Sequence, residues 1–253
     1  MSRPPVLHRK MRPMAAFATL GDEGLRNVND RLDVLLHRDQ VEDVHALRVA
    51  VRHLRAVTWA FGPILPQVIK GRWNQALRDV ADAAGAVRDW DVFIVETLQP
   101  ALALQPDNPV LTALIDTAYA RRAEARVTMI ARLSGYRQAP LPTLHRDLLH
   151  LSDPRHRHGD HGRMVSFAPR RIRKARGRVR ELARIARDGQ TEHVHKLRIG
   201  NKRLRYAIEA LADVLPDRYR KRLHHKLIAQ QTELGAIIDD AVARRLMCEC
   251  LEG

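Results

Sequence analysis

Hydrophobic positions recur at intervals of three and four residues along most of the chain, as at Leu25, Val28, Leu32 and Leu35. This spacing places apolar side chains on one face of an α-helix. The alternating pattern of a half-buried strand is not found, and prolines and glycines separate the periodic segments. The pattern therefore predicts an all-α fold. The expected helices lie near 14–37, 40–61, 67–85 and 89–133, the last interrupted around 106–109, and near 167–188, 191–213, 217–234 and 236–250.

The chain contains an internal repeat. Residues 44–55 read VHALRVAVRHLR and residues 194–205 read VHKLRIGNKRLR; residues 84–92 and 234–242 form a second pair at the same offset of 150 positions. A constant offset means that one structural unit is repeated, which predicts two tandem four-helix bundles related by a pseudo-twofold axis. We expect one domain over 1–253, with a first repeat at 12–152, a linker at 153–165 and a second repeat at 166–253.

The expected linker includes RHRHGDHGR at residues 155–163. Its glycines and charges are typical of a solvated connection. His156, His158 and His161 raise the possibility of a metal site, but a structural zinc site needs four rigid ligands and no such set is evident. We predict no metal and no cofactor.

The charge balance is strongly basic, with 44 Lys and Arg against 29 Asp and Glu, a formal net charge of +15 and a pI near 10.8. Such an excess predicts a polyanionic partner. Cys248 and Cys250 provide no disulfide framework, and no apolar run is long enough to span a membrane. These features predict a protein of the cytoplasm that does not enter a membrane.

Four basic residues of the first copy share one arc of roughly 80° on a helical wheel, beside an apolar arc of Leu47, Val51 and Leu54. Four basic residues of the second copy occupy matched positions. A solvated helix face usually mixes charge signs, whereas crowded like charges repel. Their repetition therefore favours a ligand site for an anion. The two sets are His45, Arg48, Arg52 and Arg55, and His195, Arg198, Lys202 and Arg205.

The repeated pattern of His-x-Leu-Arg followed by a basic Leu-Arg, with Gly85 and Asp89 matched by Gly235 and Asp239, resembles the CHAD domain, the conserved histidine α-helical domain. The resemblance covers nearly the whole chain. It implies two four-helix bundles around a basic central cavity that binds inorganic polyphosphate, and by the same resemblance an association with polyphosphate granules. The chain has no element of the triphosphate tunnel enzymes to which many relatives are joined, so it looks like a stand-alone member.

Three residues depart from the family pattern. Gly200 and Asn201 interrupt the second motif, and His53 stands where the first motif more commonly has an arginine. Each lowers the local charge or weakens the helix, so the cavity is expected to be uneven between its halves. The predicted polyphosphate-binding set also includes Arg72, Arg78, Arg203, Arg222 and Lys226.

Possible catalytic groups are few. Arg88, Asp89 and Asp91 could suggest an acid or metal pair, but a helix N-cap with a salt bridge is the preferred interpretation. Neither a nucleophile motif nor a glycine-rich phosphate loop is found. We therefore expect a non-enzymatic protein that binds inorganic polyphosphate, with other polyanions as further partners. Nucleic-acid binding and polyphosphate hydrolysis stay open as alternative functions. The sequence does not report the preferred length of the polyphosphate chain or the oligomeric state of the protein.

Overall fold

The computed structural model describes residues 5–153, 155 and 162–251, except for the side chains of 232–241. Within these residues the chain forms helices and no strand, which confirms the all-α class. The order is α1 (Pro13–His37), α2 (Val41–Phe61), α3 (Gln67–Ala83), α4 (Gly85–Phe93), the π-helical η1 (Ile94–Leu98), α5 (Gln99–Leu104), α6 (Pro109–Leu133), η2 (Ser134–Arg137), α7 (Leu141–Ser152), α8 (Met164–Ile185), η3 (Ala186–Asp188), α9 (Thr191–Ala210), η4 (Ala212–Val214), the π-helical η5 (Arg218–Leu223) and α10 (His224–Leu251).

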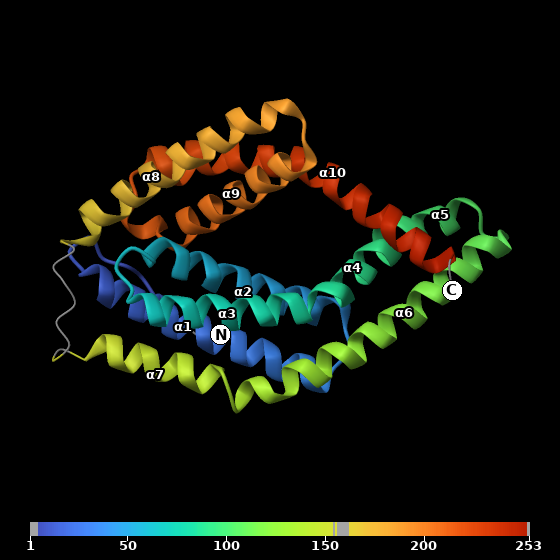
Figure 1. Cartoon of the computed structure of the whole chain (residues 1–253), viewed down its shortest axis with the longest axis horizontal. Coiled ribbons are helices and arrows are strands. Elements are labelled where there is room, and N and C mark those ends of the chain that lie inside the picture. Colours follow the sequence, from blue (N-terminus) through green and yellow to red (C-terminus); the bar gives the residue numbers. More distant parts are fainter. Residues whose placement is uncertain (1–4, 154, 156–161, 252–253) are drawn as a thin grey trace.

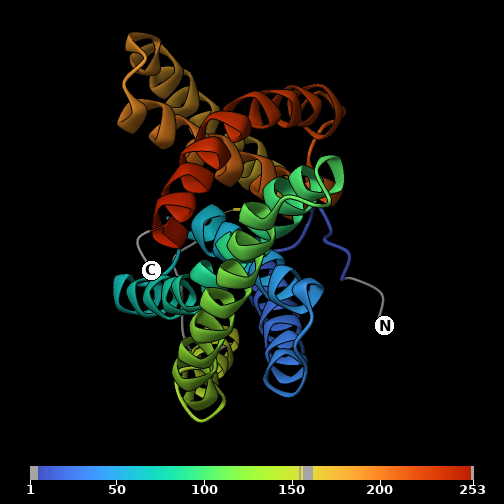
Figure 2. The ribbon, with the colours of Figure 1, turned by 90° about the vertical axis from the view of Figure 1, so that its right-hand side faces the viewer.

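The helices form two groups. In Figures 1 and 2, α1, α2, α3 and α7 pack together in one group, and α8, α9 and α10 lie above it in the other. Helices α2 and α9 contact each other where the two groups meet. At the far end α10 crosses back to contact α4 and α6. The repeat boundaries and the pseudo-twofold axis stay predictions.

Aromatic side chains join the two groups through a shared core. The Phe17 ring centroid lies 5.8 Å from that of Phe61 and 5.4 Å from that of Trp73, and Phe61 stacks on Phe167 of α8 at 5.4 Å. All four side chains are buried. Because aromatic rings bury large apolar areas, this core fixes α8 against α1 and α2 and so holds α9 over α2. A second, smaller core includes Trp90, Phe93, Ile94 and Leu98 with Leu246 of α10.

Two expected helix boundaries are wrong. The sequence predicted no separate helix after residue 133, yet α7 begins at Leu141, with Pro140 and Pro142 at its N-terminus. Proline is tolerated in a first helical turn because no intrahelical N–H bond is needed there. The segment predicted as two helices, 217–234 and 236–250, contains the single helix α10 from His224, since one internal glycine costs only about 1 kcal/mol.

Asn201 lies in the core where the first repeat has Val51. Asn201 is 0 % exposed, and neither atom of its amide has a hydrogen-bond partner among the described residues. A buried amide without partners costs about 1–3 kcal/mol. We therefore expect Asn201→Val to raise the free energy of unfolding by about that amount in urea titrations. Val51→Asn is the matched control and should lower it; if Asn201→Val has no effect, an internal water satisfies the amide.

Candidate polyanion-binding site

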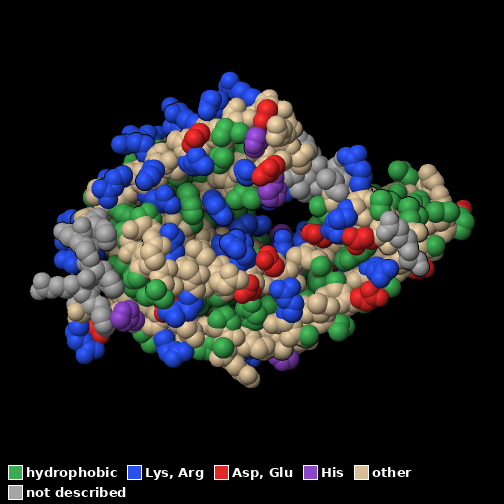
Figure 3. Space-filling model, viewed as in Figure 1, with side chains coloured by type: hydrophobic (Ala, Val, Ile, Leu, Met, Phe, Trp, Pro, Cys, Tyr) green, Lys and Arg blue, Asp and Glu red, His purple; other side chains and the backbone are tan. Residues whose placement is uncertain are grey.

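A hollow opens between the two groups of helices. Figure 3 shows it bordered by Lys, Arg and His side chains, with some carboxylates, in the region where α2 and α4 face α9 and α10. Helix α2 turns its apolar arc inward, since Leu47, Val51 and Leu54 are at most 1 % exposed. In the basic arc beside them, Arg52 lies against Tyr206 of α9 and Arg48 against Ala81 of α3.

Tyr206 of α9, which is only 5 % exposed, lies against side chains of α2. The guanidinium carbon of Arg52 lies 4.8 Å from the centre of this ring, and that of Arg205 lies 4.3 Å away. The His53 ring meets Tyr206 edge-on at 4.8 Å. An aromatic face attracts cations, so one tyrosine gathers basic groups from both repeats.

Glu209 is the carboxylate that contacts the basic residues around Tyr206 among the described residues. Its Oε1 lies 2.8 Å from Nε2 of His224 and 3.6 Å from Nε of Arg205, and its Oε2 lies 4.0 Å from Nδ1 of His53. One carboxylate cannot neutralise so many basic groups. We call this group the Tyr206 cluster, made of Arg52, His53, Arg205, Tyr206, Glu209 and His224.

The arginines of α2 are held partly out of water. Burial is the main cause that lowers the pKa of Arg48, Arg52 and Arg55, and neighbouring arginines lower it further. Nε of Arg52 is buried without a hydrogen-bond partner among the described residues. Guanidinium groups stay charged in proteins, so the positive charge is kept at a cost in desolvation. A bound anion would offset that cost.

Arg55 of α2, Arg78 of α3 and Arg203 of α9 form a second concentration of charge, the three-arginine cluster. Arg203 is still exposed to water, but its partial burial lowers its pKa, and the charges of Arg55 and Arg78 lower it further. Arg78 likewise lowers the pKa of Arg55, while Asp82 raises it. No hydrogen bond or ion pair is seen for these three guanidinium groups in the part of the chain that the structure describes. Three arginines whose charges act on one another, and which form no ion pair with a described carboxylate, suit a multiply charged anion.

The N-terminal end of the basic arc of α2 lies against the junction of α3 and α4. Arg48 donates from Nη1 to the carbonyl oxygen of Ala81 at 3.0 Å, and the same nitrogen would lie 3.7 Å from a Cβ built on Gly85. His45 is largely exposed, but its partial burial lowers its pKa, and the charges of Arg88, Arg52 and Arg48 lower it further. Gly85, the glycine of the family pattern, thus lies beside the basic arc of α2.

The structure places the other predicted residues in several ways. On α9, Arg198 and Lys202 are half-buried and His195 is exposed. Arg222 and Lys226 are exposed, and none of the pairings described above includes them. The partner glycine and aspartate of the second repeat, Gly235 and Asp239, have side chains outside the described residues, and His156, His158 and His161 of the linker lie outside them altogether.

Arg72 is not brought to the hollow. It forms two hydrogen bonds with the carboxylate of Asp147 on α7, from Nε at 3.0 Å and from Nη2 at 2.6 Å. The expectation that Arg72 follows Arg78 to the site overlooked α7, because that helix was not predicted. The pair joins α3 to α7.

The residues after Gly85 serve packing. Asp89 is the fifth residue of α4 and so is not its N-cap, which corrects one expectation. The expected salt bridges are present: Asp89 lies 3.4 Å from Nη2 of Arg245, and buried Asp91 lies 2.6 Å from Nε of Arg122. These pairs fix α4 against α10 and α6.

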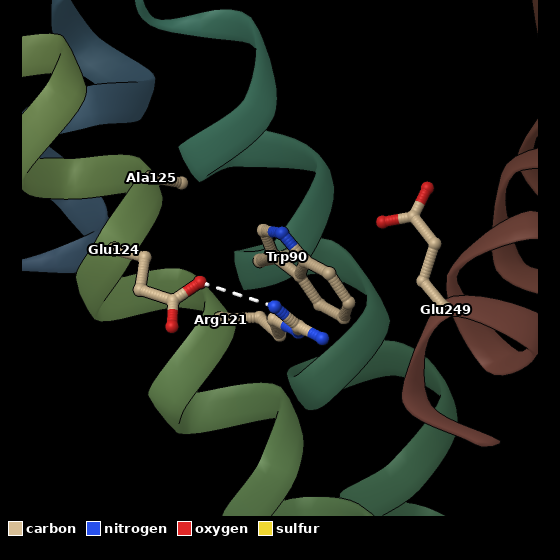
Figure 4. Close-up of a pocket in the computed structure, with 5 residues that line it drawn as sticks. All are labelled: Trp90, Arg121, Glu124, Ala125 and Glu249. Atoms are coloured by element: carbon tan, nitrogen blue, oxygen red, sulfur yellow. Dashed lines mark hydrogen bonds and ion pairs between the residues drawn. The ribbon is translucent and has the colours of Figure 1, made fainter. Parts of the chain in front are cut away.

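A separate hollow of about 500 Å³ lies between α4, α6 and α10. Figure 4 shows Trp90 between Arg121 and Glu249, with an ion pair of 3.3 Å from Arg121 to Glu124. Glu249 is paired with Arg245. Since each carboxylate here already has its own arginine, this hollow does not suit a polyanion.

None of the described helices combines the length and apolarity that crossing a membrane requires. Among curated proteins, none matches the chain.

Two solved structures share the fold. The crystal structure of the CHAD domain from the plant Ricinus communis has a TM-score of 0.74 and 24% identity, over 99% of this chain and 83% of that one. PptA from Streptomyces chartreusis has a TM-score of 0.58 and 14% identity, over 95% and 94%. The family model of the CHAD domain matches residues 20–248. The chain therefore belongs to the CHAD domain family.

Proposed function

We propose that this protein binds inorganic polyphosphate, without cleaving it, in the hollow where α2 and α4 face α9 and α10. The observation that carries the proposal is the Tyr206 cluster, where Arg52 and Arg205 come from different repeats onto one ring and Glu209 is their described carboxylate. Polyphosphate bears a negative charge on every unit and has no bases to accommodate. Membership of the CHAD family supports the same ligand class.

The binding mechanism is electrostatic. Along α2, the basic residues from His45 to Arg55 extend over about 15 Å, since each residue advances a helix by 1.5 Å. A linear anion along this line would meet His45 and Arg48 first, the Tyr206 cluster next and the three-arginine cluster last. Guanidinium groups donate paired hydrogen bonds to phosphate oxygens, which gives each contact a defined geometry.

Incubation with long-chain polyphosphate tests binding and cleavage together. The expected result with Mg²⁺ or Mn²⁺ present is a retarded complex on native gels and polyphosphate of unchanged length after the protein is removed. Shortening of the chain would show a hydrolase. Absence of a complex at low salt would overturn the proposed binding.

Nucleic-acid binding is a second candidate because of the outer face of α8. This helix has eight arginines and lysines and one acidic residue, Glu181, and every one of the cations except Arg171 is exposed. Such a surface neutralises phosphates regardless of sequence. Competition between polyphosphate and duplex DNA separates the candidates: we expect polyphosphate to displace DNA at equal phosphate concentration, and the reverse order would favour the nucleic-acid function.

Binding should strengthen as the pH falls. Burial lowers the pKa of His45 below its usual value, and the charges of Arg88, Arg52 and Arg48 lower it further. Burial and the arginines also lower the pKa of His53, against the raising effect of Glu209. Both shifts favour the neutral rings in the free protein, whereas a bound polyanion favours their charged forms. Binding then takes up protons, so affinity rises as the pH falls toward and below about 6.5.

Titration of long-chain polyphosphate from pH 7.5 to pH 5.5 measures this effect. Long chains are used because their internal phosphates stay ionised throughout. The double variant His45→Gln, His53→Gln should show a flatter profile. An unchanged slope in that variant would assign the protons to other groups.

A further inference from the structure

We call the proposed line of phosphate contacts, from His45 and Arg48 through the Tyr206 cluster to the three-arginine cluster, the phosphate track. A pocket of about 330 Å³ lies beside it, between α8, α9 and the C-terminal end of α2. Its floor is apolar and includes Val179 and Leu182 of α8 and Ile199 of α9, and Trp59 of α2 lines it as well. Pockets of this size with mostly apolar walls and a few polar groups are typical of small-molecule sites. Inorganic polyphosphate has no group that would use an apolar floor.

Trp59 is fixed in place by Arg171. The guanidinium carbon of Arg171 lies 4.1 Å from the centre of the indole, while its nitrogens donate to the carbonyl oxygens of Ala60 at 3.0 Å and Trp59 at 2.8 Å. Burial lowers the pKa of Arg171, consistent with a structural position. The indole is therefore held in one orientation before any ligand arrives, which favours stacking.

Gly200 brings the two helices together at this floor. A Cβ at this position would lie 2.9 Å from Cδ1 of Leu182 and 3.5 Å from Cγ2 of Val179. The first repeat has Ala50 at the equivalent position. The glycine that departs from the family pattern thus shapes a pocket in the second repeat.

The rim of the pocket is cationic. Arg178 and Lys196 line it, and each is paired with an exposed carboxylate, Glu181 and Glu192 respectively. Exposed pairs contribute little and can exchange partners with a ligand. Arg203 lines the pocket too and at the same time belongs to the three-arginine cluster. This one side chain connects the apolar pocket with the phosphate track.

We propose that the pocket takes the base of a nucleoside polyphosphate, whose phosphates extend from Arg203 toward Arg55 and Arg78. The inference rests on the proposed phosphate binding and adds a second ligand class to it. An aromatic base stacks on Trp59 and covers the apolar floor. The ligand is thus recognised by a flat aromatic group joined to several phosphates.

Calorimetric titration without metal compares two ligands of similar charge, adenosine triphosphate and methyl triphosphate. Stacking of one base contributes about tenfold in affinity or more, so adenosine triphosphate should bind about tenfold more tightly. Equal affinities would overturn the base pocket while leaving the phosphate track intact. Failure of both ligands to bind would overturn the phosphate track and this pocket together.

Variants locate the base. Val179→Trp fills the pocket without changing charge and should remove the preference for adenosine triphosphate while methyl triphosphate binds as before. Val127→Trp, at a position on α6 that is 71% exposed, is the matched control and should keep the preference. Trp59→Leu keeps an apolar wall but no stacking surface, and serves if Val179→Trp does not fold. Persistence of the preference in the folded pocket variants would place the base elsewhere.

Discussion

The double substitution Arg52→Glu, Arg205→Glu is expected to weaken polyphosphate binding more than 100-fold at physiological ionic strength. Both guanidinium groups lie on Tyr206, one from each repeat, so the pair removes cations from both walls of the hollow at once. It also adds two carboxylates next to Glu209. Like charges brought together cost several kcal/mol, and 1.4 kcal/mol is a factor of ten, so two reversed contacts account for the expected loss.

The control has the same change in net charge at a different place. Arg176→Glu, Arg187→Glu alters two exposed residues on or just after α8, and its affinity for polyphosphate should fall less than about threefold, because exposed charges act weakly through salt solution. Fluorescence polarisation of labelled polyphosphate measures both, with circular dichroism to show intact helices. Equal losses in the two variants would mean that net charge alone, and not the hollow, attracts the anion.

The helical fold could be predicted from the sequence because it depends on local patterns. The apolar arc of α2 is buried as the helical wheel predicts, and Leu204 and Ile208 repeat this burial in α9. Helix ends are harder to predict where the same residue type can either end one helix or begin the next. Pro140 and Pro142 were interpreted as breaks, although proline both ends one helix and begins another.

The site could be predicted only in part, because a repeat shows which residues are equivalent but not which ones meet. Tyr206 was missed: its equivalent in the first repeat is Ala56, so it belongs to no repeated motif. The pairing of Glu209 with Arg205 could be predicted from the sequence, since Glu209 lies four residues after Arg205 on the same helix face. The effect of the Arg55 and Arg78 charges on the pKa of Arg203 depends on how α9 lies relative to α2 and α3, which no local pattern reports.

Arg72 shows how a basic residue in a predicted binding set can have a structural role, and its partner gives the largest expected effect on stability. Asp147 is 7% exposed and accepts hydrogen bonds from Nε and Nη2 of Arg72 and, at 3.2 Å, from Nε1 of Trp73, whose side chain is fully buried. Asp147→Ala leaves the indole N–H buried without an acceptor and Arg72 without its partner. Because Arg72 is partly exposed, we expect a loss of about 3 kcal/mol in the free energy of unfolding, at the lower end for a broken buried pair.

Urea titration measures this loss, and polyphosphate titration of the folded protein shows whether the pair belongs to the site. Asp217→Ala, which breaks exposed ion pairs with Arg220 and Lys221, is the control and should lower the free energy of unfolding much less than Asp147→Ala does. Arg72→Gln should destabilise the fold, because Arg72 of α3 pairs with Asp147 of α7. The variant should keep the affinity of the protein for polyphosphate, since Arg72 takes no part in the contacts between α2 and α9. If Arg72→Gln instead weakens binding at unchanged stability, Arg72 exchanges Asp147 for phosphate, and the site extends along α3 to α7.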